Sequence, residues 1–131
     1  MLDTNVLFSC LVYPSKGSLK FLRLLEKNVK IFLPDYVVDE LLKVVEKKRP
    51  DKLEIVKNTF KRFHHTLVKT PEDYTDVPNI RDEKDKPILA AAIKSDVDYL
   101  ITGDKDFLVL KDIVKKPKIF TMQEFIEKFS K

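Results

Sequence analysis

Short apolar segments of β type alternate with helical segments along most of the chain. Strand-like composition occurs at residues 29–33, 66–69, 98–102 and 118–120, and apolar residues recur with helical spacing at 18–28, 35–48, 51–65 and 85–95. Ser18 is the predicted cap of the first of these helices, and Thr121-Met-Gln-Glu124 has the sequence of a capping box that begins a last helix. Residues 71–84 contain two prolines and predict a long loop. The alternation predicts an α/β fold with a parallel sheet covered by helices on both faces.

The size and composition of the chain limit the classes of protein to which it can belong. Its 131 residues are the size of one domain, and we expect residues 1–131 to form a single one. A composition of 44% hydrophobic and 35% charged residues excludes general disorder. The longest apolar run, Ile88-Leu-Ala-Ala-Ala-Ile93, is far shorter than the roughly 20 residues of a membrane helix. A single cysteine, Cys10, excludes an internal disulfide framework and a Cys-rich zinc site. We expect a small cytoplasmic domain with no membrane attachment.

Charge is unevenly distributed, although the formal net charge is only +4. Residues 41–70 and 107–131 carry an excess of Lys and Arg, and residues 71–106 carry an excess of Asp and Glu. The basic total is weak support for a nucleic-acid partner, because a Lys-rich helical face is as readily explained by solvation. If the basic segment does bind phosphates, its affinity falls steeply with salt. The candidate RNA-binding residues are Lys47, Lys48, Arg49, Lys57, Lys61 and Arg62.

Several carboxylates follow the ends of predicted strands. Asp3 comes after Met1-Leu2 at the start of a helix, and Asp104 and Asp106 come after the apolar strand at 98–102. In an open parallel α/β fold the functional crevice lies beyond the carboxyl ends of the strands, so these acids are expected at one edge. Each also has a simpler interpretation, since Asp3 can cap its helix and Gly103-Asp104 can form a turn.

Two helices bring further carboxylates to the same region. In the helix at 35–48, Glu40 falls on the border of the apolar stripe, whereas Asp39 falls on the solvent side. Asp85 begins the helix at 85–95, with Asp82 three residues earlier. The simpler interpretations are a surface ion pair for Glu40, a helix cap for Asp85 and a loop position for Asp82. Taken together, so many acids at one edge repel one another unless a cation is bound. Their oxygens suit Mg²⁺ or Mn²⁺, which can promote phosphodiester hydrolysis.

Four motifs resemble those of the PIN domain, and they occur in the order and spacing of that family. They are Leu2-Asp3-Thr4-Asn5-Val6-Leu7, Val38-Asp39-Glu40-Leu41, Arg81-Asp82-Glu83-Lys84-Asp85 followed by Ile88-Leu89-Ala90-Ala91-Ala92, and Thr102-Gly103-Asp104-Lys105-Asp106-Phe107. The match covers essentially the whole chain. In particular, the chain resembles stand-alone prokaryotic (VapC-like) PIN proteins, described as toxin components of toxin–antitoxin pairs.

The resemblance implies a three-layer α/β/α sandwich with a central parallel sheet, and cleavage of RNA that depends on Mg²⁺ or Mn²⁺. It implies that Asp3, Glu40, Asp85 and Asp104 are catalytic and hold the metal, with Asp106 as a fifth metal-binding acid. It implies auxiliary roles for Asn5, Asp82 and Thr102, and it suggests an antitoxin protein and a second copy of the chain as partners. Family members usually carry several apolar residues before the first Asp. Here Met1 and Leu2 precede Asp3, so we expect a weak central strand.

Two other functions are considered beside a ribonuclease. A phosphatase with an aspartyl nucleophile would need a second Asp two positions after Asp3, and that position is Asn5. A non-catalytic RNA- or protein-binding module on the same fold would carry these acids without turnover. Cleavage of RNA that is lost in Asp3→Asn distinguishes a nuclease from such a module.

Overall fold

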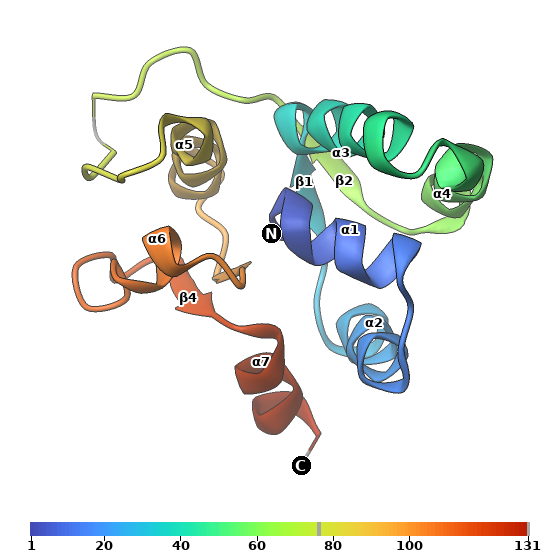
Figure 1. The fold of residues 1–131 in the computed structure, drawn as a ribbon. Helices are drawn as coiled ribbons and strands as arrows, with labels where there is room; N and C mark the ends of the chain where they lie inside the picture. Colours follow the sequence, from blue (N-terminus) through green and yellow to red (C-terminus); the bar gives the residue numbers. More distant parts are fainter. Residues whose placement is uncertain (76, 131) are drawn as a thin grey trace.

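The computed structural model describes residues 1–75 and 77–130; Asp76, within the predicted loop at 71–84, and Lys131, at the end of the basic tail, lie outside them. The fold is α/β (Figure 1). The helices are α1 (Thr4–Val12), α2 (Lys16–Asn28), α3 (Asp35–Lys48), α4 (Leu53–Arg62), α5 (Lys86–Lys94), α6 (Lys105–Leu108) and α7 (Met122–Phe129). The strands are β1 (Phe32–Pro34), β2 (Thr66–Val68), β3 (Tyr99–Ile101) and β4 (Lys118–Phe120), and two 3₁₀ turns are η1 (Pro50–Lys52) and η2 (Glu83–Asp85).

The strands are parallel, as predicted, but they form two pairs instead of one continuous sheet. β1 pairs with β2, and β3 pairs with β4. The N-terminal segment lies beside β3, where Leu2 forms a single parallel bridge with Ile101. The expected central strand is weak: Leu2 forms a single bridge, and α1 begins directly after its cap, Asp3. Figure 1 shows the strands between α3 and α5 above and α2 and α7 below.

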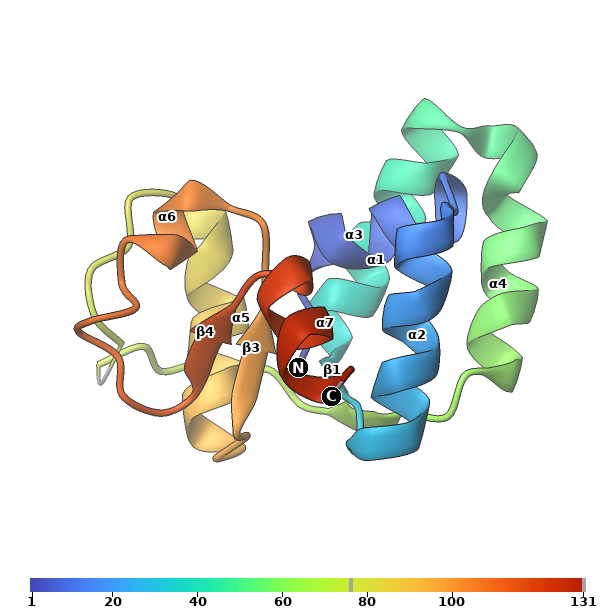
Figure 2. The ribbon, with the colours of Figure 1, turned by 90° about the horizontal axis from the view of Figure 1, so that it is seen from below.

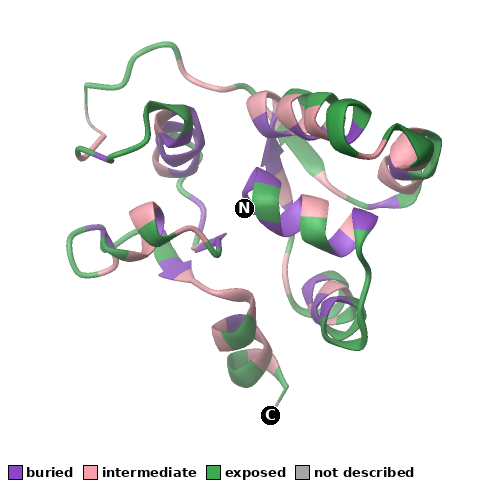
Figure 3. Cartoon of the chain, in the orientation of Figure 1, coloured by how far each residue is buried: buried purple, intermediate pink, exposed green. Residues whose placement is uncertain are grey.

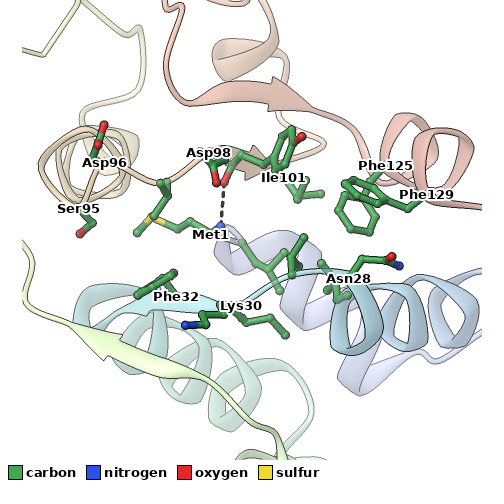
Figure 4. Close-up of a pocket in the computed structure, with 16 residues that line it drawn as sticks. Met1, Asn28, Lys30, Phe32, Ser95, Asp96, Asp98, Ile101, Phe125 and Phe129 are labelled. Atoms are coloured by element: carbon green, nitrogen blue, oxygen red, sulfur yellow. Dashed lines mark hydrogen bonds between the residues drawn. The ribbon is translucent and has the colours of Figure 1, made fainter.

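A cavity of about 490 Å³ separates the two strand pairs. Its lining includes Met1, Phe32 of β1 and Ile101 of β3 (Figure 4). The amino group of Met1 donates a hydrogen bond of 2.8 Å to the carbonyl of Tyr99. Burial lowers the pKa of this amino group to about 5, against a smaller raising effect of the Asp98 charge. The cavity therefore lies at the end of β3 where that strand begins, opposite the end that Thr102 follows.

The buried apolar side chains form one cluster that runs through both strand pairs (Figure 3). Leu2 and Leu100 are fully buried near its middle, and Phe21 of α2 meets Phe125 of α7 edge to face with ring centroids 5.5 Å apart. Figure 2 shows α7 between α2 on one side and β3 and β4 on the other. Within residues 1–75 and 77–130, no helix has the length and hydrophobicity needed to cross a bilayer.

Helix ends explain most of the differences from the predicted boundaries. α2 begins earlier than expected because Ser15, not Ser18, is its cap; Ser18 instead completes a capping box from the third helical position. The capping box of Thr121 and Glu124 at α7 is confirmed. The predicted helix at 51–65 is η1 followed by α4, and α6 follows β3 where a turn was expected.

Candidate metal centre

Asp3 is held rigidly between α1 and β3. One carboxylate oxygen, Oδ1, accepts a hydrogen bond of 2.9 Å from the backbone of Val6 and so caps α1. The other, Oδ2, accepts a hydrogen bond from the hydroxyl of Thr102. Asp3 is only 3% exposed. Burial raises its pKa, the hydrogen bonds from Thr102 and Val6 oppose that effect, and the charges of Asp104 and Glu40 add to it. The capping interpretation of Asp3 is therefore right, and it coexists with a buried, fixed carboxylate.

Thr102 links Asp3 to the acids that follow β3. Its Oγ1 donates to Asp3 and accepts a hydrogen bond of 3.0 Å from the backbone N–H of Asp104. Asp104 in turn caps α6, because its Oδ1 accepts a hydrogen bond of 2.9 Å from the backbone of Asp106. Thr102 is fully buried, so its orientation is fixed by packing as well. The strand end thus places Asp104 beside Asp3.

Glu40 points from α3 toward α1, and its neighbour Asp39 is exposed, as the apolar stripe of the helix predicts. Its Oε1 accepts a hydrogen bond from the hydroxyl of Thr4, and its Oε2 accepts one of 3.2 Å from the hydroxyl of Tyr36. Burial, followed by the charge of Glu40, raises the pKa of Tyr36 to about 12, which keeps this hydroxyl a donor. Thr4 and Tyr36 were not predicted from the sequence as partners of Glu40. The spacing of Tyr36, four residues before Glu40 on one helix face, was the available signal.

Asp85 is the most unusual of the acids. It closes η2 at the start of α5 and is 9% exposed, and its Oδ2 is a buried atom with no hydrogen-bond partner. Burial raises its pKa to about 7, with further contributions from the charge and hydrogen bonding of Asp104 and from the charges of Asp82 and Asp3. A carboxylate oxygen of Asp85 lies within 4.8 Å of oxygens of both Asp82 and Asp106.

The predicted site residues therefore do not all lie equally close together. Within the described ranges, the tight group of three possible ligands is Asp82, Asp85 and Asp106, not the four acids predicted to be catalytic. Asp104 adjoins that group by accepting the hydrogen bond from the backbone of Asp106, and Thr102 links Asp104 to Asp3. The hydrogen bonds of Glu40 go to Thr4 and Tyr36 instead. Asn5 is exposed on α1 and is not among the hydrogen-bonded residues around Asp3.

The candidate RNA-binding residues lie at some distance from these acids. Lys47, Lys48 and Arg49 end α3, roughly 10–13 Å along the helix from Glu40. Arg49 is engaged by Asp51, with its Nη2 2.8 Å from Oδ2, and stacks over Tyr13. α4, which carries Lys57, Lys61 and Arg62, lies on the far side of α3 from α5 and α6 (Figure 1).

The donor set fits a hard divalent cation. All the candidate ligand atoms are carboxylate oxygens, which Mg²⁺ and Mn²⁺ prefer. Among the residues that the structure describes, the ion pairs of Lys and Arg involve other acids, so these carboxylates have no protein counter-charge within 4.0 Å. A buried carboxylate oxygen without a partner is costly unless it is protonated or bound by a cation. The orphaned Oδ2 of Asp85 is consistent with a place for such an ion.

Comparison with known proteins gives the family of this chain. The sequence profile of the PIN domain matches residues 1–106. Among solved structures, the chain is similar to one in the crystal structure of VapBC2 from Rickettsia felis bound to a DNA fragment from their promoter. The TM-score is 0.66 and the sequence identity 20%, over 92% of this chain and 95% of that one. No curated protein matches by sequence. Because the profile covers most of the chain, and because the parallel α/β fold agrees with it, the protein belongs to the PIN-domain family.

Proposed function

We propose that this PIN-domain protein is an endoribonuclease that depends on Mg²⁺ or Mn²⁺ and acts in the cytoplasm. The observation that carries the proposal is the buried Asp85 carboxylate, which has an unpartnered Oδ2 and lies among other acids without counter-charges. Membership of the PIN-domain family supports nuclease chemistry. The alternative, a binding module on the same fold, gives no reason for leaving such a costly group in the interior.

The proposed ligands are Asp3, Asp85 and Asp104, with Glu40 and Asp106 beside them. When bound there, the cation would supply positive charge that polarises a phosphate oxygen and makes water more acidic. The chain's own contribution is orientation. Thr102 and Val6 hold the two oxygens of Asp3, and Thr4 and Tyr36 hold the two oxygens of Glu40, so neither carboxylate needs to reorganise when substrate arrives.

Cleavage of a mixed RNA pool tests the proposal. We expect the wild type to cleave RNA with Mg²⁺ or Mn²⁺, and to lose this activity with EDTA or in Asp3→Asn, a substitution that keeps the size and capping ability of the side chain. Asp39→Asn is the matched control, because it removes an exposed acid next to Glu40 and should leave cleavage unchanged. Cleavage that persists in Asp3→Asn would overturn the assignment.

We also propose that the protein is the toxin of a toxin–antitoxin pair, with the antitoxin as its partner and RNA as its substrate. Support comes from the likeness in fold and in length to a chain of the VapBC2 structure. Expression of the wild type in a bacterium should arrest growth, and expression of Asp3→Asn to the same level should not. Equal growth of the two cultures would argue for the non-catalytic module instead. Gel filtration of Asp3→Asn tests the expected homodimer.

A further inference from the structure

Aromatic side chains of α1 and its cap lie against basic side chains at the end of α3. The Nζ of Lys48 lies over the ring of Phe8, 5.9 Å from its centroid, and the guanidinium of Arg49 lies over Tyr13 at 5.3 Å. Both distances are in the range of a cation–π contact. The rings of Phe8 and Tyr13 meet edge to face, with centroids 5.8 Å apart. These four residues form what we call the aromatic–basic patch.

The patch belongs to the same pair of helices that carries part of the metal centre. α1 and α3 pack side by side and run in the same direction (Figure 1). Where α1 begins, the hydroxyl of Thr4 donates to Glu40, and where it ends, Tyr13 meets Arg49. Along a helix the step from Thr4 to Tyr13 is roughly 13 Å, at about 1.5 Å per residue. A polymer that is bound at the metal centre and follows α1 therefore reaches the patch.

The patch offers an exposed ring next to an unpaired cation. Tyr13 is 54% exposed, and Phe8 is half-buried. Arg49 is engaged by Asp51, with 3.0 Å between Nε and Oδ1 and 2.8 Å between Nη2 and Oδ2, so its charge is already balanced. Lys48 is exposed and forms no ion pair in the part of the chain that the structure describes. Its charge is therefore available to a phosphate.

This combination of side chains fits unpaired nucleotides. Unpaired bases stack on aromatic side chains, while basic groups beside them attract the phosphates of the backbone. In a duplex the bases stack on one another, so an exposed ring favours a single strand. A partner protein could also cover Tyr13, but the uncompensated charge of Lys48 and the helix pair shared with Glu40 favour RNA.

We propose that single-stranded RNA runs from the metal centre along α1, with a base stacked on Tyr13 and a phosphate bound by Lys48. Phe8 holds the ring of Tyr13 by its edge, and Arg49 holds it by one face. This inference rests on the proposed cleavage of RNA and specifies the substrate as a single strand. It also assigns a binding role to an aromatic ring, where the candidate RNA-binding residues of the sequence were all basic.

Binding of a short single-stranded oligoadenylate to the full chain in EDTA, followed by fluorescence anisotropy, tests the stacking. We expect Tyr13→Ala to weaken binding at least about fivefold, which is the effect of losing one contact between a base and an aromatic ring. Tyr13→Phe keeps the ring and should bind as the wild type does. Tyr74→Ala is the matched control, because it removes an exposed aromatic ring from the loop at 71–84 and should leave the affinity unchanged.

An abasic strand of the same length distinguishes stacking from a structural role of Tyr13. It keeps the phosphates and lacks the bases, so the wild type and Tyr13→Ala should bind it equally. Loss of abasic binding in Tyr13→Ala as large as the loss for oligoadenylate would overturn the inference, because the ring would then act on the protein and not on a base. Circular dichroism of each variant confirms that its fold is retained.

The outcomes also separate this inference from the proposed function. Equal affinities of the wild type and Tyr13→Ala for oligoadenylate, in a chain that cleaves RNA, would overturn the path along α1 and leave the nuclease proposal standing. A wild type that neither binds nor cleaves RNA would overturn both.

Discussion

At the scale of single residues, the site consists of carboxylates in very different environments. Both oxygens of Asp3 and both oxygens of Glu40 accept hydrogen bonds. Asp85 is the exception, with a buried oxygen that nothing in the described chain satisfies. Without a cation, burial and neighbouring charge make the ionised form of Asp85 unfavourable, which raises its pKa from 3.8 to about 7.

This raised pKa gives the protein without metal a definite pH dependence. The folded chain binds the Asp85 proton more tightly than the unfolded chain does. The resulting stability is fully present below about pH 4 and is lost as the pH rises through 7. Burial raises the pKa of Asp3 too, which acts in the same direction. We therefore expect Asp85→Asn to raise the Tm in EDTA at pH 8 and to have little effect at pH 4. Thermal unfolding at both pH values checks this, and an equal Tm difference at both would contradict it.

Part of this residue-level description could be predicted from sequence. The capping position of Asp3 and the inward direction of Glu40 follow from local periodicity, and both are confirmed. The resemblance placed Asp82 and Asp106 in one pocket, but that they form the tightest group with Asp85 could not be predicted, because it depends on how η2 packs against α6 across an intervening helix and strand. The membership of Asp82 in the tight group of three acids is therefore a finding of the structure.

At the scale of elements, short strands limited what the sequence could predict. The bounds of α3 and β4 match the prediction, because Pro34 and the flanking polar residues delimit them. The division into two strand pairs depends on the segment before Asp3, which forms one bridge to β3. The periodicity of that short segment does not reveal which strand it pairs with.

The end of α5 gives a test at this scale. Asp96 has a φ of 54°, and the backbone N–H groups of Asp96 and Val97 donate to the carbonyls of Ile93 and Ala92, which is a Schellman motif. We expect Asp96→Gly to be more stable than Asp96→Ala by about 1 kcal/mol, since only glycine adopts this conformation without strain. Both variants lose the exposed ion pair with Lys116, so that loss cancels. Urea unfolding measures the difference, and an alanine variant of equal stability would contradict it.

At the scale of the whole molecule, the candidate metal-binding acids and the candidate RNA-binding residues occupy different regions. The candidate acids gather where α1, α5 and α6 begin, and the candidate RNA-binding residues end α3 or lie on α4. The net charge of +4 thus conceals a separation that the uneven charge along the sequence already indicated. With this separation, the metal centre would cleave an RNA chain whose phosphates are bound by basic residues elsewhere on the surface.

The salt dependence of RNA binding tests which basic residues take part. Lys47 and Lys48 are exposed on α3, which also carries Glu40, whereas Lys61 and Arg62 lie on α4 beyond it. We expect Lys47→Ala with Lys48→Ala to reduce the slope of log affinity against log salt by roughly 0.7 per lysine. Lys61→Ala with Arg62→Ala should leave the slope unchanged. Binding of a single-stranded RNA in EDTA measures both, and equal slopes for the two double variants would contradict this expectation.

We propose above that the carboxylates around Asp85 bind a divalent cation. Titration calorimetry of Mn²⁺ into the wild type and Asp85→Asn at pH 7.5 tests it most directly, with Asp39→Asn as the control for loss of one acid. We expect binding by the wild type and by Asp39→Asn, and an affinity at least about tenfold weaker in Asp85→Asn. Equal affinities of the wild type and Asp85→Asn, or no binding by the wild type, would contradict it.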